Sequence, residues 1–137
     1  MRVLVAGATG AMGKELVPRL VDAGHEVFAM IRGESKKVRA SQLGAVPVIA
    51  DALDRAQVEA AVRQAAPEVI VNQLTAIEHV DTRHFDRSFA ATNRLRIEGT
   101  DNLLAAARAT GFNYEHDLAA PVHAHRHERA AQPVGRR

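Results

Sequence analysis

The residues best suited to chemistry lie near the amino terminus, where three glycines recur at intervals of three in Gly7-Ala8-Thr9-Gly10-Ala11-Met12-Gly13. The apolar run Val3–Ala6 before them is typical of a buried strand, and apolar residues spaced as on a helix follow them. A strand, a glycine turn and a helix in this order aim backbone N–H groups and the positive helix end at one point. Glycines there allow the tight turn, close approach to a phosphate and close helix–strand packing. The pattern predicts a dinucleotide site, the alternative being a glycine-rich turn of another α/β protein.

The elements that must position this loop alternate regularly along the chain. We expect strands at Arg2–Ala6, Glu26–Ile31, Ala45–Ala50 and Glu68–Asn72, and helices at Ala11–Ala23, Ser35–Leu43, Asp54–Ala65 and about Arg83–Thr110. Strands separated by helices imply right-handed crossovers and a parallel sheet. The predicted fold class is therefore α/β, a partial doubly wound, Rossmann-like sheet of about four strands in the order 3-2-1-4.

Individual residues refine this pattern. Met12, with Leu16 and Leu20 behind it, is expected in the apolar stripe of the first helix. Pro18 is expected inside this helix, where it costs a hydrogen bond, and Gly24 ends the helix as a left-handed C-cap. Asp54 is the expected N-cap of the third helix. Gly99 is expected to be a weak point of the long last helix.

The end of the second strand indicates which nucleotide is bound. NAD-type sites carry an acidic residue about 20 positions after the glycines, where it binds the adenosine ribose. Here Arg32 follows the strand, with Lys36 and Lys37 close behind. A guanidinium can pair in forked fashion with a 2′-phosphate, so the chemistry favours NADP over NAD, although Arg32 could also be a solvated charge.

Two further loops leave strands at the same sheet edge, where ligands bind in such folds. Asp51 could accept a hydrogen bond from the adenine amino group, or form the turn before the next helix, or do both. Asn72–Ala76 could line the nicotinamide ribose or could be an ordinary strand-to-helix loop.

Composition bounds the function classes. The 137 residues are 47% hydrophobic and 25% charged, as in a soluble globular domain, and the formal charge of +2 gives no reason to expect nucleic acid. The sequence has no cysteine, no apparent signal peptide and no apolar run long enough for a membrane span. We therefore expect a cytoplasmic protein without a membrane partner.

Together these residues resemble the short-chain dehydrogenase/reductase superfamily, in its extended or atypical branch of NAD-dependent epimerase/dehydratase-like proteins. The resemblance covers about residues 1–111 and also includes the helix segment Asn93–Leu104. It implies an NAD(P)-dependent oxidoreductase or epimerase-dehydratase, with Asn93 near the active site or supporting the sheet. The cofactor-binding residues it implies are Gly7, Thr9, Gly10, Ala11, Met12, Gly13, Arg32, Asp51, Ala52, Leu74, Thr75 and Ala76.

The chain departs from this family after Gly111. The tyrosine of such families is followed four residues later by a lysine, whereas Leu118 stands four residues after Tyr114, the only tyrosine here. No catalytic residue is therefore assigned, and whether the chain is an enzyme is left open. We expect an NAD(P)-binding domain at residues 1–111, truncated relative to the family, and a disordered non-family tail at 112–137.

Three further hypotheses complete the sequence-based analysis. The missing proton-transfer pair would also suit a non-catalytic module that senses NADP. His123, His125 and His127 could meet at a metal only if the tail is extended, and we expect no metal site. A homo-oligomer could form through the fourth strand or the long helix, because that strand would present an apolar unpaired edge.

Overall fold

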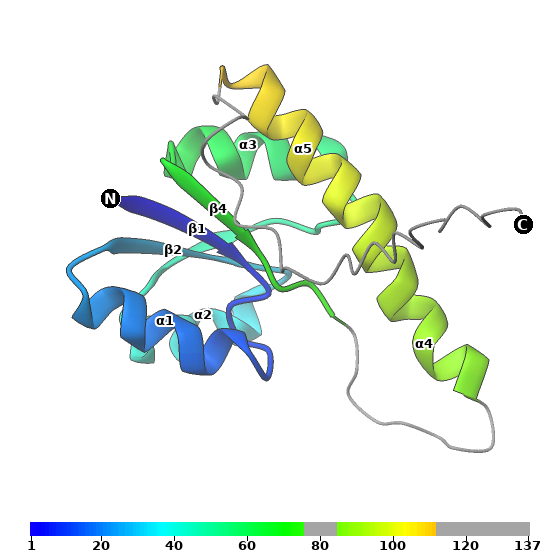
Figure 1. Ribbon diagram of the computed structural model, residues 1–137, viewed down its shortest axis with the longest axis horizontal. Coiled ribbons are helices and arrows are strands. Elements are labelled where there is room, and N and C mark those ends of the chain that lie inside the picture. Colours follow the sequence, from blue (N-terminus) through cyan, green and yellow to red (C-terminus); the bar gives the residue numbers. More distant parts are fainter. Residues whose placement is uncertain (76–84, 112–137) are drawn as a thin grey trace, which may run out of the picture.

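A computed structural model gives the structure of the chain and describes residues 1–75 and 85–111 (Figure 1). Four strands form one parallel sheet in the order β3-β2-β1-β4, which confirms the predicted fold class and strand order. Their bounds are β1 Arg2–Ala6, β2 Glu26–Ile31, β3 Val46–Ile49 and β4 Val69–Asn72. All four carboxyl ends therefore meet at one edge of the sheet.

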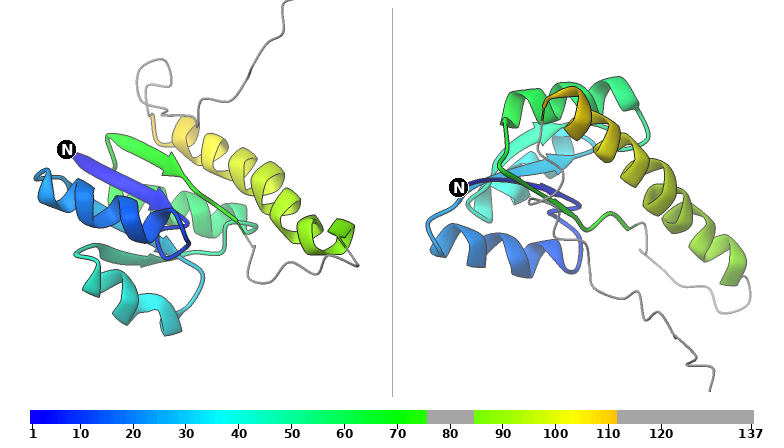
Figure 2. Two further views of the ribbon diagram at one scale, coloured as in Figure 1. Left: turned by 60° about the horizontal axis from the view of Figure 1, so that its bottom comes forward. Right: turned by 45° about the horizontal axis from the view of Figure 1, so that its top comes forward.

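Helices cover both faces of the sheet, as the right-hand view of Figure 2 shows. One face carries α1 (Gly13–Asp22), the short 3₁₀ turn η1 (Glu34–Lys36) and α2 (Lys37–Gln42). The other carries α3 (Arg55–Ala65) and a continuous helical segment made of α4 (Phe85–Arg94), the π-turn η2 (Leu95–Gly99) and α5 (Thr100–Ala109).

The sheet separates two hydrophobic clusters, and β1 contributes alternate side chains to each. Val3 and Val5 pack with Val17 of α1, whereas Leu4 packs with Val58 of α3 and Leu103 of α5. Because both faces are covered, residues 3–6 of β1 are all apolar instead of alternating with polar residues. Its continuous apolar run is thus explained by burial on two sides.

Two predicted helix termini are confirmed. Asp54 is the N-cap of α3, where its side chain accepts a hydrogen bond from the backbone N–H of Gln57 at 3.1 Å. Gly24 follows α1 with φ +84°, in the left-handed region. Pro18 lies inside α1 as expected, and the helix continues past it.

The prediction for Met12 is wrong. The helix begins at Gly13 and not at Ala11, so Met12 occupies the N-cap position and its side chain is 67% exposed. The glycine loop turns this residue outward before the helical spacing begins. The apolar stripe of α1 consists of residues such as Val17, which is fully buried.

Gly99 is a packing position of the long helix, and a π-turn that ends at this residue interrupts the regular α-helix, so the expected weakness there stays a prediction. It ends the π-turn and is buried, and a Cβ atom placed on it would lie 2.9 Å from Cδ1 of Leu74. A larger residue here would force the side chain of Leu74 to shift, so glycine lets the helix lie close to the loop after β4. The expected start of this helix at Arg83 and the expected tail both fall outside the described residues.

Within the described ranges 1–75 and 85–111, no helix is long and apolar enough to span a bilayer. In the same ranges β4 pairs only with β1, so its outer side is an edge of the described sheet. Association through this edge stays a prediction.

Candidate functional site

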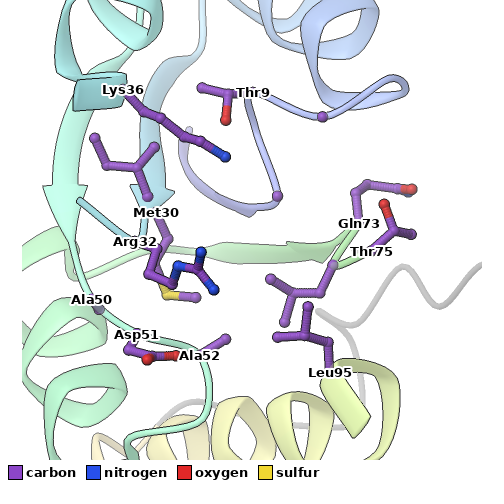
Figure 3. Close-up of a pocket in the computed structure, with 14 residues that line it drawn as sticks. Thr9, Met30, Arg32, Lys36, Ala50, Asp51, Ala52, Gln73, Thr75 and Leu95 are labelled. Atoms are coloured by element: carbon purple, nitrogen blue, oxygen red, sulfur yellow. The ribbon is translucent and has the colours of Figure 1, made fainter. Parts of the chain in front are cut away.

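A crevice of about 240 Å³ opens at the carboxyl edge of the sheet (Figure 3). It is bounded by the loops that leave β1, β2, β3 and β4, together with one residue of η2. This is the edge at which ligands bind in parallel α/β sheets. Its lining residues are Gly7, Thr9, Gly10, Met30, Ile31, Arg32, Lys36, Ala50, Asp51, Ala52, Gln73, Leu74, Thr75 and Leu95.

The glycine loop owes its shape to contacts that exclude side chains. Gly7 has φ +84°, and a Cβ atom on it would lie 2.3 Å from the carbonyl oxygen of Gln73. A Cβ atom on Gly13 would lie 2.4 Å from the carbonyl oxygens of both Gly7 and Ala8. Gly7 therefore allows the turn beside β4, and Gly13 lets α1 start directly against the end of β1. Two of the three predicted glycine functions are confirmed.

The same loop presents backbone donors at the positive end of α1. The first hydrogen bonds of the helix start from the N–H groups of Lys14 and Leu16, which bond to the carbonyl oxygens of Gly10 and Met12. For the N–H groups of Ala11 and Met12, the described part of the chain supplies no backbone acceptor. Donors in this arrangement, added to the helix dipole, suit a pyrophosphate.

Two cationic side chains point into the crevice (Figure 3). Arg32 directly follows β2, and Lys36 is the last residue of η1. Neither forms an ion pair with a described residue, whereas Lys37 is paired with Glu34 at 2.7 Å. The charges of Arg32 and Lys36 are therefore available to an anionic ligand.

The cationic side continues into a second cavity of about 550 Å³, which shares Thr9, Gly10, Lys36, Gln73 and Thr75 with the crevice and adds Arg39. Ala11 and Met12, which do not line the crevice itself, line this second cavity. The glycine loop therefore borders both cavities, and the positively charged Lys36 lines both of them as well.

Asp51 forms the turn after β3 and also lines the crevice. Its Oδ1 accepts a hydrogen bond from the N–H of Leu53 at 3.0 Å, and its own N–H donates to Oε1 of Gln57 at 3.0 Å. The turn-forming alternative is therefore correct. Its second carboxylate oxygen has no hydrogen bond to a described residue, so the adenine contact stays a prediction.

The loop after β4 is held by the last residue of the strand. Oδ1 of Asn72 accepts a hydrogen bond from the N–H of Leu74 at 3.1 Å, and Leu74 and Thr75 line the crevice. Ala76 lies outside the described residues. Among the predicted cofactor residues, the structure thus brings Gly7, Thr9, Gly10, Arg32, Asp51, Ala52, Leu74 and Thr75 together in one crevice.

Sequence reasoning did not assign Met30, Ile31, Ala50 or Leu95 to the site, and it named Lys36 and Gln73 only as neighbours of the residues expected there. Met30, Ile31 and Ala50 stand at strand ends and could have been found from that position alone. Leu95 comes from η2, on the face of the sheet opposite α1, and its position in the sequence does not indicate that it lies near the strand ends. Asn93 is exposed on α4 and lines neither cavity.

The geometry is that of a nucleotide-binding Rossmann fold, and the sequence agrees with it. Residues 3–120 match the profile of the family described as the NAD dependent epimerase/dehydratase family. The chain belongs to this family. The match extends past residue 111, and the domain boundary expected there stays a prediction.

Three relatives illustrate the family membership. A 3-diazoavenalumate denitrifying reductase of a Streptomyces species is 50% identical over 111 residues, which are 81% of this chain and 35% of the reductase. The UDP-glucose 4-epimerase of Thermus thermophilus, solved with NAD, has a TM-score of 0.67 at 26% identity and is matched over 82% of this chain and 35% of its own. The photosystem II assembly factor Ycf39 of a Synechocystis species is 29% identical over 82% of this chain and 31% of its own length. The chain spans about a third of these relatives.

These comparisons support binding of a nucleotide cofactor by this chain of the epimerase/dehydratase family. Tyr114, Leu118 and the histidines at 123, 125 and 127 lie outside the described residues. Within residues 1–75 and 85–111, no three His, Cys, Asp or Glu side chains are grouped as metal ligands.

Proposed function

We propose that this chain is the nucleotide-binding part of an NADP-dependent reductase of the epimerase/dehydratase family. The observation that carries the cofactor choice is the pair of cations at the end of β2, Arg32 and Lys36, which both point into the crevice (Figure 3). The 2′-phosphate is the group that distinguishes NADP from NAD, and it needs cationic donors at this strand end. Asp51, across the crevice on the β3 loop, is free to accept from adenine.

The reaction class rests on the relative with 50% identity over 81% of this chain, which is named a reductase. NADPH, when bound, supplies the hydride. The residues of this chain bind and orient it. The amides just before α1 hold the pyrophosphate, the loop with Asp51 and Ala52 lies at the adenine, and the loop with Leu74 and Thr75 lies along the nicotinamide ribose. The substrate and the full activity are proposals for the whole protein, of which this chain would be the cofactor-binding part.

Calorimetric titration tests the cofactor choice with a matched pair of variants. The wild-type chain is expected to bind NADP more tightly than NAD. Lys36→Ala removes a charge that faces the crevice and should weaken NADP binding about threefold to tenfold, since a hydrogen bond to a charged group is worth about 1.5 kcal/mol or less when solvent-exposed.

Lys37→Ala is the control for this titration, because it removes the same charge one residue away. Lys37 is occupied by Glu34 and lines neither cavity, so NADP affinity should stay unchanged. Equal effects of the two variants would show only a general charge effect, and a wild-type preference for NAD would overturn the NADP assignment.

A non-catalytic NADP-sensing module is the second candidate, favoured by the missing tyrosine–lysine pair and by the relative named as an assembly factor.

For both candidate functions we expect the isolated chain to show no hydride transfer, because a positioned general acid alone typically raises the rate about 10²–10⁴-fold. Loss of NADPH absorbance with a panel of carbonyl substrates measures this. Rapid turnover that survives Tyr114→Phe would show that another group donates the proton.

A further inference from the structure

The helical segment α4–η2–α5 is fastened to two loops of the crevice. Two side-chain hydrogen bonds connect them: Asn72, the last residue of β4, donates to Thr100, and Asn102 donates to the loop after β3. Thr100 and Asn102 lie in the first turn of α5, directly after the π-turn. One turn of one helix thus contacts both loops, one of them expected at the adenine and the other at the nicotinamide ribose.

Thr100 holds the β4 loop through Asn72. Nδ2 of Asn72 donates to Oγ1 of Thr100 at 2.8 Å, and this hydroxyl donates in turn to the carbonyl oxygen of Arg96. With its nitrogen engaged there, Asn72 turns its Oδ1 toward the N–H of Leu74, which lines the crevice. The hydroxyl therefore fixes which way the amide points, and the amide fixes the loop.

Asn102 holds the β3 loop directly. Its Nδ2 donates to the carbonyl oxygen of Ala52 at 2.9 Å, across 50 positions of the sequence. Ala52 lines the crevice beside Asp51, whose Oδ1 accepts from the next amide, that of Leu53. The hydrogen bond from Asn102 thus anchors the turn that carries Asp51.

Gly99 brings the helix close enough for both bonds. A Cβ atom on it would lie 2.9 Å from Leu74 Cδ1 and 3.5 Å from Ala52 Cβ, so the helix backbone stands between the two loops. Thr100 and Asn102 reach to either side from there. A loop held in its binding conformation before the ligand arrives does not have to be ordered on binding.

We propose that Thr100 and Asn102 are positioning residues of the nucleotide crevice, which act on the cofactor through Asn72 and Ala52 and do not touch it. This rests on the proposed function, because it assigns the crevice to the dinucleotide. Removing either bond should weaken NADP binding about threefold to tenfold, the change equivalent to one intramolecular hydrogen bond of about 1 kcal/mol.

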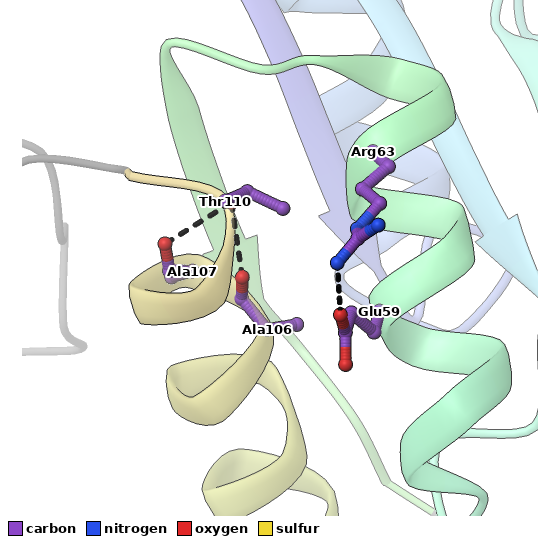
Figure 4. A network of polar contacts seen from close by, with 5 residues as sticks. All are labelled: Glu59, Arg63, Ala106, Ala107 and Thr110. Atoms are coloured by element: carbon purple, nitrogen blue, oxygen red, sulfur yellow. Dashed lines mark hydrogen bonds and ion pairs between the residues drawn. The ribbon is translucent and has the colours of Figure 1, made fainter.

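The test compares Thr100→Val and Asn102→Leu, which keep side-chain size and remove the bond, with Thr110→Val. Thr110 ends the same helix and donates to the carbonyl oxygens of Ala106 and Ala107, far along the helix from the crevice (Figure 4). For each variant we would measure the NADP dissociation constant, the melting temperature, and hydrogen exchange of the Leu53 and Leu74 amides without ligand.

We expect faster exchange at Leu74 in Thr100→Val and at Leu53 in Asn102→Leu, with weaker NADP binding in both. Thr110→Val should lower the melting temperature comparably and leave exchange at both amides and NADP affinity unchanged. If the wild type binds NADP and all three variants bind it equally well, the inference fails while the proposed function stands. If the wild type binds neither NADP nor NAD, the proposed function fails and the inference fails with it.

Discussion

Replacing Gly13 by alanine is expected to lower the melting temperature by roughly 10 °C and to abolish dinucleotide binding. The new Cβ atom would lie 2.4 Å from two backbone carbonyl oxygens, those of Gly7 and Ala8, and neither can move without shifting the end of β1. Overpacking of this kind costs about 1–3 kcal/mol, and more when backbone must move. For a chain of 137 residues each kcal/mol shifts the melting temperature by roughly 4 °C.

Gly33→Ala is the matched control for Gly13→Ala. A Cβ atom there meets nothing within 4 Å, and φ of −161° is extended backbone that alanine adopts freely. Thermal unfolding followed by circular dichroism should give a melting temperature close to that of the wild type. A Gly13→Ala chain as stable as Gly33→Ala would show that α1 does not rest against the end of β1 as described.

Arg32→Ala is expected to reduce NADP affinity about 10- to 100-fold and to change NAD affinity little. A hydrogen bond to a charged group contributes about 1.5–3 kcal/mol, and a forked guanidinium–phosphate pair is at the strong end of that range. The guanidinium lies in the crevice without an ion pair to any described residue, so its removal leaves no partner unpaired there.

Titration of Arg32→Ala with both dinucleotides isolates the 2′-phosphate, because NADP and NAD differ only in that group. Arg32→Lys provides a second comparison, since it keeps the charge and loses the forked geometry, and should fall between wild type and alanine. Equal losses for NADP and NAD would place Arg32 against the adenine or ribose and not the phosphate.

The strands could be predicted well because each is short, apolar and bounded by turn residues. β1 and β2 have the predicted bounds, and β3 and β4 are each shorter than predicted by one or two residues at their ends. Asp54 was identifiable because an N-cap is a local feature, set by its own side chain and an amide three residues later. Met12 was misplaced because its spacing fits the helix stripe, while the loop turns it to solvent.

The site could be predicted as far as its residues follow strand ends. Arg32, Asp51 and Leu74 were found in this way, since the carboxyl ends of parallel strands share one edge. The bonds from Thr100 and Asn102 join residues 28 and 50 positions apart, and nothing in the local sequence indicates their partners. Such contacts depend on where the last helix crosses the sheet, which periodicity does not determine.

The π-turn has a consequence for how this helix tolerates change. An α-helix rotates about 100° per residue, and a π-turn fits one more residue into a turn, so α4 and α5 are out of phase by about one position. α5 packs against α3 through Leu103, Ala106 and Ala107. Deleting one residue from the exposed stretch 96–98 would restore regular phase and rotate Leu95 away from the crevice, with α5 still in place. The helix can therefore absorb a single-residue change in length at this point while α5 keeps its place in the core, at the cost of the packing of Thr92 and Leu95.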